Sequence, residues 1–407
     1  MALIFSDNDR AGRLDYVAAW YKKAAQFIQN THIEVAFVST NSITQGEQIP
    51  ILWKDMLNEH GMKINFAYRT FKWSNEAKGK AAVHCVIIGF SQHDRKIKRL
   101  FEHDEKGDLI EQQVDQINGY LVAAGNIFIE TRAKPKEGLP KIIQGSKPWD
   151  GGFLLLSEEE KNELISKYPQ ASDFIKQYIG SSELINGENR YCLWLVDVSP
   201  MKYRNIPEVM ERLDGVRKTR QQTKAVAVQK QADTPTLFSQ NRQPKTNYLA
   251  VPEVSSERRK YIPIGYLDRD VIASNKLLVV PEASLYHFGV LTSNVHMAWM
   301  RVVAGRLKSD YSYSPAVYNN FPWPDATDEQ KAAIEQLAQA ILNARANHSE
   351  GSLADLYDPL TMPPDLLKAH QALDKAVWRL YGFTPKTHTS EAAVVASLME
   401  RYQELVG

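Results

Sequence analysis

Apolar residues at helical and strand spacings alternate along the first ninety residues. A helical stripe covers residues 14–28, and a β-branched run follows at residues 33–38. A second helical stretch is predicted at residues 47–60, and two strands follow at 63–69 and 81–90. The second of these strands is nearly all apolar, which is typical of a strand covered on both faces. This order of elements predicts the second half of a wound α/β domain.

The hydrophobic pattern changes twice in the rest of the chain. Residues 91–318 predict short strands separated by many turns, with a basic helix from Pro207 to about Val228. A polar stretch at residues 233–245 predicts an exposed loop. From Thr327 onward three apolar stripes predict a small group of C-terminal helices.

The sequence motifs that bind nucleotide cofactors are not found next to these predicted helices and strands. Dinucleotide and S-adenosylmethionine sites in wound α/β folds use a glycine-rich turn after the first strand. Neither that turn nor a GxxxxGK[ST] phosphate loop occurs in a suitable context. We therefore expect the chain to begin in the middle of a domain.

Composition narrows the class of protein. The 407 residues, 43% hydrophobic and 24% charged, suit two or three globular domains. No apolar run is long enough to cross a membrane and no signal peptide is recognisable, so we expect a cytoplasmic protein. Cys85 and Cys192 favour free buried thiols over a disulfide or a metal site. The histidines, including His84, His287 and His296, lack zinc-binding spacing, and no metal is expected.

The charge distribution is uneven although the net charge is only +1. Residues 200–260 hold 13 Lys and Arg against 6 Asp and Glu, whereas residues 325–407 hold 7 against 12. This pattern indicates either a surface for a polyanion or two solvated faces of opposite sign. If the surface binds DNA, the predicted phosphate contacts are Arg217, Lys218, Arg220, Lys224, Arg258, Arg259 and Lys260.

Aromatic and basic residues alternate in the segment 66–80. Aromatic rings offer faces on which a base stacks, and cations offset phosphate charge. The alternative is that Phe66 and Phe71 are core residues of the adjoining strands. The segment contains the aromatics Tyr68, Phe71 and Trp73 and the cations Arg69, Lys72, Lys78 and Lys80.

Six segments resemble one family in the family's own order, from about Leu14 to the C-terminus. They read LDYVAAWYKKAA, FVSTNSITQGEQ, FAYRTFKWSNEAKGKAAVHCVIIGF, ELINGENRYCLWL, ASNKLLVVPEASLYHFGVLTSNVHMAWMRVVAGRLKSDYSYS and VYNNFPWP. The family comprises the MmeI-like, type IIL restriction–modification enzymes and related adenine-specific DNA methyltransferases. The resemblance implies a fold of class α/β. Residues 1–92 would be the C-terminal half of a Rossmann-like methyltransferase domain, 93–325 a mixed α/β target-recognition domain, and 326–407 a helical C-terminal element.

The resemblance also implies roles for particular residues. Phe71 is the best match to the aromatic that packs on the flipped target adenine, and Trp73 is the second. The complete enzyme would use S-adenosylmethionine to methylate the adenine N6 amine in double-stranded DNA. The catalytic Asn-Pro-Pro-Phe motif of the family is missing, and the similar-looking segment 319–323 has the wrong order. We therefore expect no catalytic residue in this chain, no cofactor binding by the chain alone, and no activity alone.

Two other readings stay open. The chain is then either a stand-alone DNA-specificity subunit that partners a separate chain carrying the missing methyltransferase half, or an inactive fragment.

Overall fold

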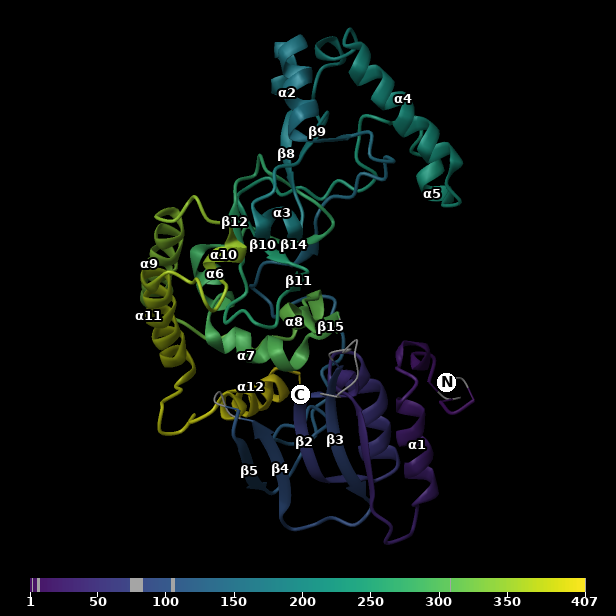
Figure 1. The fold of residues 1–407 in the computed structure, drawn as a ribbon, viewed down its shortest axis with the longest axis vertical. Helices are drawn as coiled ribbons and strands as arrows, with labels where there is room; N and C mark the ends of the chain where they lie inside the picture. The colour runs from purple at the N-terminus through teal and green to yellow at the C-terminus, as the bar shows by residue number, and fades with distance from the viewer. Residues whose placement is uncertain (2, 6–7, 74–82, 104–106, 308, 407) are drawn as a thin grey trace. The chain divides into compact units, whose positions relative to one another are not determined.

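The computed structural model describes residues 1–407 except 2, 6–7, 74–82, 104–106, 308 and 407 (Figure 1). The chain forms two compact units. The first comprises residues 1–136, 294–327 and 374–407, and the second comprises 137–293 and 328–373. The C-terminal helices are therefore shared between the two units.

The first unit is built on a five-stranded sheet with strand order β1-β3-β2-β4-β5. β3 runs antiparallel to both of its neighbours, so β1 and β2 are parallel to each other, and β4 is parallel to β2. The strands are β1 (Val35–Thr40), β2 (Lys63–Trp73), β3 (Val83–Ser91), β4 (Lys98–His103) and β5 (Leu109–Val114). β1, β2 and β3 confirm the sequence prediction, whereas β4 and β5 were not anticipated.

Helix α1 (Ala18–Phe27) packs its buried face on this sheet (Figure 1). The ring of Tyr21 is fully buried and meets Phe37 on β1 and Phe90 on β3, with ring centroids 5.1 Å and 5.6 Å away. The helix predicted at residues 47–60 is present as two wide π-helical turns, Ile49–Trp53 and Asp55–Glu59. The predicted half of a wound α/β domain is thus confirmed.

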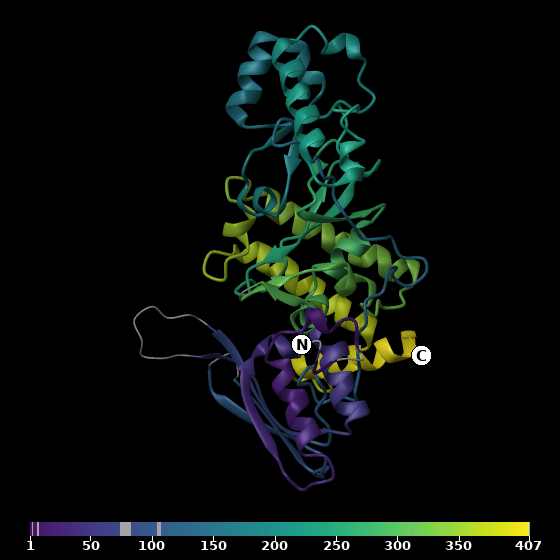
Figure 2. The ribbon, with the colours of Figure 1, turned by 90° about the vertical axis from the view of Figure 1, so that its right-hand side faces the viewer.

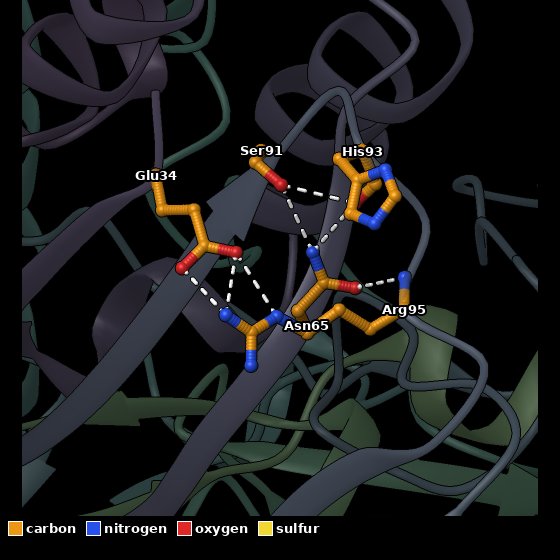
Figure 3. A network of polar contacts seen from close by, with 5 residues as sticks. All are labelled: Glu34, Asn65, Ser91, His93 and Arg95. Atoms are coloured by element: carbon orange, nitrogen blue, oxygen red, sulfur yellow. Dashed lines mark hydrogen bonds and ion pairs between the residues drawn. The ribbon is translucent and has the colours of Figure 1, made fainter. Parts of the chain in front are cut away.

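A polar network holds the start of β2 in register (Figure 3). Asn65 lies at an irregularity between Ile64 and Phe66, where the pairing with β3 shifts. Its amide nitrogen donates to Ser91 Oγ at 3.0 Å and to the His93 carbonyl at 2.8 Å, and its oxygen accepts the Arg95 N–H. Since Arg95 also forms a bidentate ion pair with Glu34, the network ties both neighbours of β3 to the turn after it.

The first unit also contains helices from the later chain. Asn319 and Asn320 are buried, and their amides donate to the carbonyls of Arg132 and Glu130. The segment 319–323 is therefore a brace between distant parts of the unit. The elements are short helices Ala11–Arg13 and Asn41–Thr44, α7 (Asn294–Val303), β15 (Gly305–Leu307), β16 (Asp310–Ser312), α8 (Pro315–Asn319), the end of α11 (Pro364–Tyr381) and α12 (Glu391–Val406).

The second unit holds two four-stranded sheets, ordered β12-β10-β14-β6 and β13-β8-β9-β7. Its strands are β6 (Ile143–Gln144), β7 (Leu155–Leu156), β8 (Ile175–Ile179), β9 (Tyr191–Leu193), β10 (Tyr248–Pro252), β11 (Val254–Ser255), β12 (Gly265–Leu267), β13 (Ile272–Ala273) and β14 (Leu277–Pro281). Its helices are α2 (Glu158–Lys167), α3 (Ser181–Asn186), α4 (Pro207–Gln222), α5 (Val226–Gln229), α6 (Leu285–Leu291), α9 (Asp328–Ala346), α10 (Leu353–Leu356), the start of α11, and the short turns Pro169–Asp173 and Pro200–Lys202.

Helix α4 begins at Pro207, as predicted, because proline has no N–H to lose at a first helical position. It ends at Gln222, and α5 follows after a break, so the predicted helix to Val228 is interrupted. The buried face of α4 joins a core with β7, β8 and β9. Figure 2 shows α4 beside α2, and Arg212 on α4 pairs with Glu160 on α2 at 2.5 Å.

The two cysteines lie in the interior. Cys85 and Cys192 are free and buried, as expected. No described helix is long and apolar enough to span a membrane. Among the described residues, no group of three or more His, Cys, Asp and Glu side chains is arranged to hold a metal ion.

Buried neutral histidines should make the fold sensitive to acid. Burial lowers the pKa of His287 to about 4, and its Nδ1 accepts the Ser284 N–H in the capping box of α6. An unfolded histidine takes up its proton near pH 6.5, so this stabilisation is complete above pH 6.5 and is lost as the pH falls toward 4. His287→Gln preserves the capping geometry and should flatten the fall in unfolding free energy by about 1.4 kcal/mol per pH unit in that window. Urea titrations between pH 4 and 7 measure this slope, and equal slopes for both proteins would contradict it.

Candidate nucleic-acid interface

Aromatic rings line one side of the C-terminal half of β2. In a regular strand Tyr68 and Phe71 would lie on opposite faces, because side chains alternate. The pairing of β2 with β3 shifts between these two residues, and such a bulge returns both rings to one side. Their centroids lie 5.0 Å apart in edge contact, and Phe71 meets Trp73 at 6.3 Å.

The outermost rings of this series reach solvent. Tyr68 and Phe71 are partly buried, whereas 48% of Trp73 is exposed. Phe71 is therefore not enclosed in the core, which keeps it available for stacking as the sequence hypothesis requires. Lys72, next to it, is exposed, and the predicted contacts Lys78 and Lys80 lie outside the described residues.

A polar cavity of about 220 Å³ within the first unit is lined on β2 by Arg69 and Thr70. Arg69 points its guanidinium to Glu102 on β4 at 2.5 Å, so its charge is already paired inside the unit. His103 links the cavity to the aromatic series, since its Nε2 lies 3.1 Å from the Tyr68 hydroxyl. The lining residues include Thr44, Gln45, Arg69, Thr70, Glu102, His103, Arg301, Arg306, Tyr311 and Glu391.

Two further arginines reach this cavity from the later chain. Arg301 on α7 pairs with Glu391 on α12, and the Arg306 guanidinium lies 3.9 Å from the centroid of the Tyr311 ring. The lining thus carries three arginines against two glutamates. Sequence reasoning missed these residues because nothing local links positions near 300 to β2, although they fall in one of the segments that resemble the family.

The predicted phosphate contacts of the second unit divide into two groups. Arg217, Lys218 and Lys224 are exposed at the C-terminal end of α4 and just after it. Arg217 pairs with Asp214 at 2.5 Å on the same helix. Among the described residues, no carboxylate forms an ion pair with Lys218 or Lys224, so both cations are available to a polyanion.

Arg220 is different, because its side chain is completely buried. A guanidinium has five N–H donors, and all five are used on main-chain carbonyls. Burial lowers the pKa of Arg220, yet such a group stays charged at neutral pH. No donor remains for a phosphate, so the structure gives Arg220 an internal role and we leave it out of the interface. Its acceptors are Pro148 (2.9 Å), Trp149 (3.1 Å), Gln231 (3.0 Å), Thr234 (3.0 Å) and Leu237 (2.6 Å).

The hydrogen bonds from Arg220 to these carbonyls also explain why the segment predicted as an exposed loop is held in place. Residues 233–245 form no helix or strand, as expected, but they are anchored rather than fully exposed. Phe238 is buried in the core beside Tyr178 and Trp194. The Arg220 guanidinium and the Phe238 ring therefore anchor this segment to the rest of the unit.

The second predicted group lies on the segment between β11 and β12. Arg258 is exposed and lies 3.6 Å from Asp358, which follows α10, and the Lys260 ammonium lies 5.9 Å from the Tyr261 ring. Arg259 is partly buried. Figures 1 and 2 show α10 away from α4 and α5 within this unit, so the two basic groups do not form one continuous cluster.

Comparisons with known proteins identify the family of the chain. Three family models match consecutive parts of the chain: the MmeI DNA-methyltransferase domain at residues 1–102, the MmeI target recognition domain at 123–325, and the MmeI C-terminal domain at 326–407. The chain is 42% identical over its whole length to DNA methyltransferase A of Bacillus subtilis (strain 168), covering 45% of that protein.

A solved structure extends the comparison to three dimensions. The type IIL restriction-modification enzyme MmeI, determined in complex with DNA, is 46% identical and gives a TM-score of 0.86. The match covers 100% of this chain and 54% of that chain. The chain thus spans about half the length of both relatives.

Proposed function

The chain belongs to the MmeI family of restriction–modification enzymes and DNA methyltransferases, and we propose that it recognises a specific sequence in duplex DNA and positions the target adenine for N6 methylation. One observation carries the proposal beyond family membership. Phe71 and Trp73 are at least partly open to solvent at the end of β2, and the exposed Lys72 lies between them in the sequence. A flipped base needs an aromatic wall of this kind, and its flanking phosphates need cations.

We assign a different role to each of three consecutive parts of the chain. Residues 1–92 contribute the aromatic wall, residues 93–325 read the DNA, and residues 326–407 brace the arrangement. The proposed contacts are Phe71 and Trp73 for the base, and Arg69, Lys72, Lys78, Lys80, Arg217, Lys218, Lys224, Arg258, Arg259 and Lys260 for DNA. Arg69 would have to exchange Glu102 for a phosphate on binding.

The methyl donor would be S-adenosylmethionine, the cofactor that methyltransferase relatives imply. The 407 residues include neither a glycine-rich cofactor turn nor an Asn-Pro-Pro-Phe motif. The adenine amine is a weak nucleophile and needs acceptors from such a motif to be aligned with the methyl group. We therefore propose that this polypeptide alone neither binds the cofactor nor transfers a methyl group.

A partner polypeptide carrying the cofactor-binding strands would complete the site, as in a separate specificity subunit. Two features support a docking edge for it. Among the described strands β1 pairs only with β3, so one of its edges is free to accept a further strand. On α1 and just before it, Tyr16, Trp20 and Phe27 form an exposed stripe at helical spacing.

DNA titration at several salt concentrations tests the DNA-binding half of the proposal. Replacing Arg217, Lys218 and Lys224 together by Ala should weaken binding to all sequences alike. It should also flatten the salt dependence of log K by about 0.9 for each lost phosphate contact. A control with Lys167, Lys176 and Lys202 replaced removes the same charge from ion-paired sites of the same unit. Equal slopes for the two triple variants would assign Arg217, Lys218 and Lys224 to a merely solvated face.

Methyl transfer from labelled cofactor to DNA tests the catalytic half. We expect no transfer with this polypeptide alone and transfer once a polypeptide with the glycine turn and Asn-Pro-Pro-Phe is added. Calorimetric titration of the polypeptide with S-adenosylmethionine should show no binding. Micromolar binding by the polypeptide alone would refute the proposed division of labour.

A further inference from the structure

The turn at residues 147–153 in the second unit contains an unusual backbone conformation. Trp149 has φ of +46°, and Gly151 and Gly152 have φ of +68° and +90°. Glycine adopts this left-handed region without penalty, whereas a bulky residue such as tryptophan rarely does. A conformation of this kind persists only where the surroundings enforce it, and such positions cluster at functional sites.

The surroundings of Trp149 do enforce it. Two of the five Arg220 hydrogen bonds end on the carbonyls of Pro148 and Trp149. On one side Lys147 pairs with Gln240 through two main-chain hydrogen bonds, and on the other the buried Asp150 carboxylate accepts the Leu154 N–H at 2.6 Å. The turn is therefore held at three points, and the tryptophan side chain is not needed to close it.

The enforced conformation presents an aromatic ring with a cation above it. Trp149 is only partly buried, and the Lys147 ammonium lies 4.3 Å from its ring centroid. The main-chain N–H of Arg242 donates to Ser146 Oγ, which lies just before the turn. Besides the buried Arg220, residues 217–245 contain six Lys and Arg against one acidic residue, Asp233.

The two halves of α4 lie among residues of opposite net charge. Its N-terminal half borders a cavity of about 510 Å³ that is lined by four glutamates, Glu160, Glu163, Glu208 and Glu211, and by two cations, Lys167 and Arg212. Its C-terminal half carries the exposed cations beside the turn, since Gly151 lies against Thr219. The net charge of the residues near the first half is negative, whereas the exposed residues of the second half are mainly cations, so a polyanion is attracted to the second half, where Trp149 lies.

We propose that Trp149 and Lys147 contact duplex DNA directly, the ring packing against a sugar or base edge and the ammonium meeting a phosphate. In this proposal Arg220 is the positioning residue that keeps the ring in place. The inference rests on the proposed DNA recognition and adds an aromatic contact to it. An aromatic ring beside cations suits this ligand because stacking and charge neutralisation act together.

Trp149→Gly is the decisive variant, because glycine accepts the left-handed conformation without strain. We expect it to unfold at the same or a higher urea concentration than the wild type, but to bind duplex DNA at least fivefold more weakly with an unchanged salt slope. Lys147→Gln should instead flatten the slope by about 0.9. The matched control is Phe153→Ala, which removes a 40% exposed ring at the acidic end of the same turn and should leave DNA affinity unchanged.

The outcomes separate this inference from the proposed function. Wild-type affinity for Trp149→Gly, or lower stability with unchanged affinity, would make Trp149 a packing residue and overturn the inference. If Trp149→Gly fails to fold, the salt slope of Lys147→Gln decides, and an unchanged slope overturns it. If the wild-type chain binds no duplex DNA, it is the proposed function that fails.

Discussion

Replacing Arg220 by Met is expected to lower the free energy of unfolding by at least about 3 kcal/mol. The side chain is fully buried and donates to five main-chain carbonyls. Each buried acceptor that loses its donor costs roughly 1–3 kcal/mol, although water entering the site recovers part of that loss. Methionine has a similar length and no donor, so the variant removes the hydrogen bonds with little change in packing volume. Urea unfolding measures the change.

Two comparisons make the Arg220 result specific. Arg220→Lys keeps the charge but offers only three donors, and it should fall between the wild type and Arg220→Met. Arg217→Ala removes an exposed arginine one turn earlier, which pairs with Asp214, and should cost about 0.5 kcal/mol or less. If Arg220→Met proved as mild as Arg217→Ala, the guanidinium would not be the buried clamp described above.

The helical spacing of apolar residues predicts that Arg220 is buried, but its charge led to the prediction of a surface position. Val209, Leu213 and Val216 lie at the spacing of one helical face, and position 220 is the next on that stripe. Counting it among the surface cations followed the basic composition of the segment instead. The helix itself was predicted correctly from Pro207, because its start depends on local chemistry.

The aromatic series on β2 illustrates what local patterns cannot give. The sequence identified the segment, but strict alternation separates Tyr68 from Phe71. Only the bulge in the pairing with β3 brings them together, and a bulge depends on the partner strand. The partners Glu102 and His103 on β4 were likewise invisible, because that strand was not predicted and its pairing spans more than thirty residues.

In an enzyme completed with the cofactor-binding part, Phe71→Ala should lower the rate of adenine methylation by about tenfold to a hundredfold. Stacking of one base on an aromatic ring is worth roughly 1–3 kcal/mol, and each 1.4 kcal/mol corresponds to a factor of ten. Phe71 is partly open, so the same change should cost much less folding stability than the roughly 3–5 kcal/mol of a buried phenylalanine. Single-turnover methylation and urea unfolding measure the two effects separately.

Phe90 provides the matched control for this prediction, since it lies on the neighbouring strand β3 and is only 1% exposed. Phe90→Ala should lower stability strongly, whereas Phe71→Ala should lower methylation strongly, and Phe71→Tyr should restore most of the rate because it keeps a ring. If Phe71→Ala methylates normally while Trp73→Ala does not, the base stacks on Trp73, whose ring is more exposed at the end of the same series. Normal methylation by both variants would exclude this end of β2 as the adenine wall.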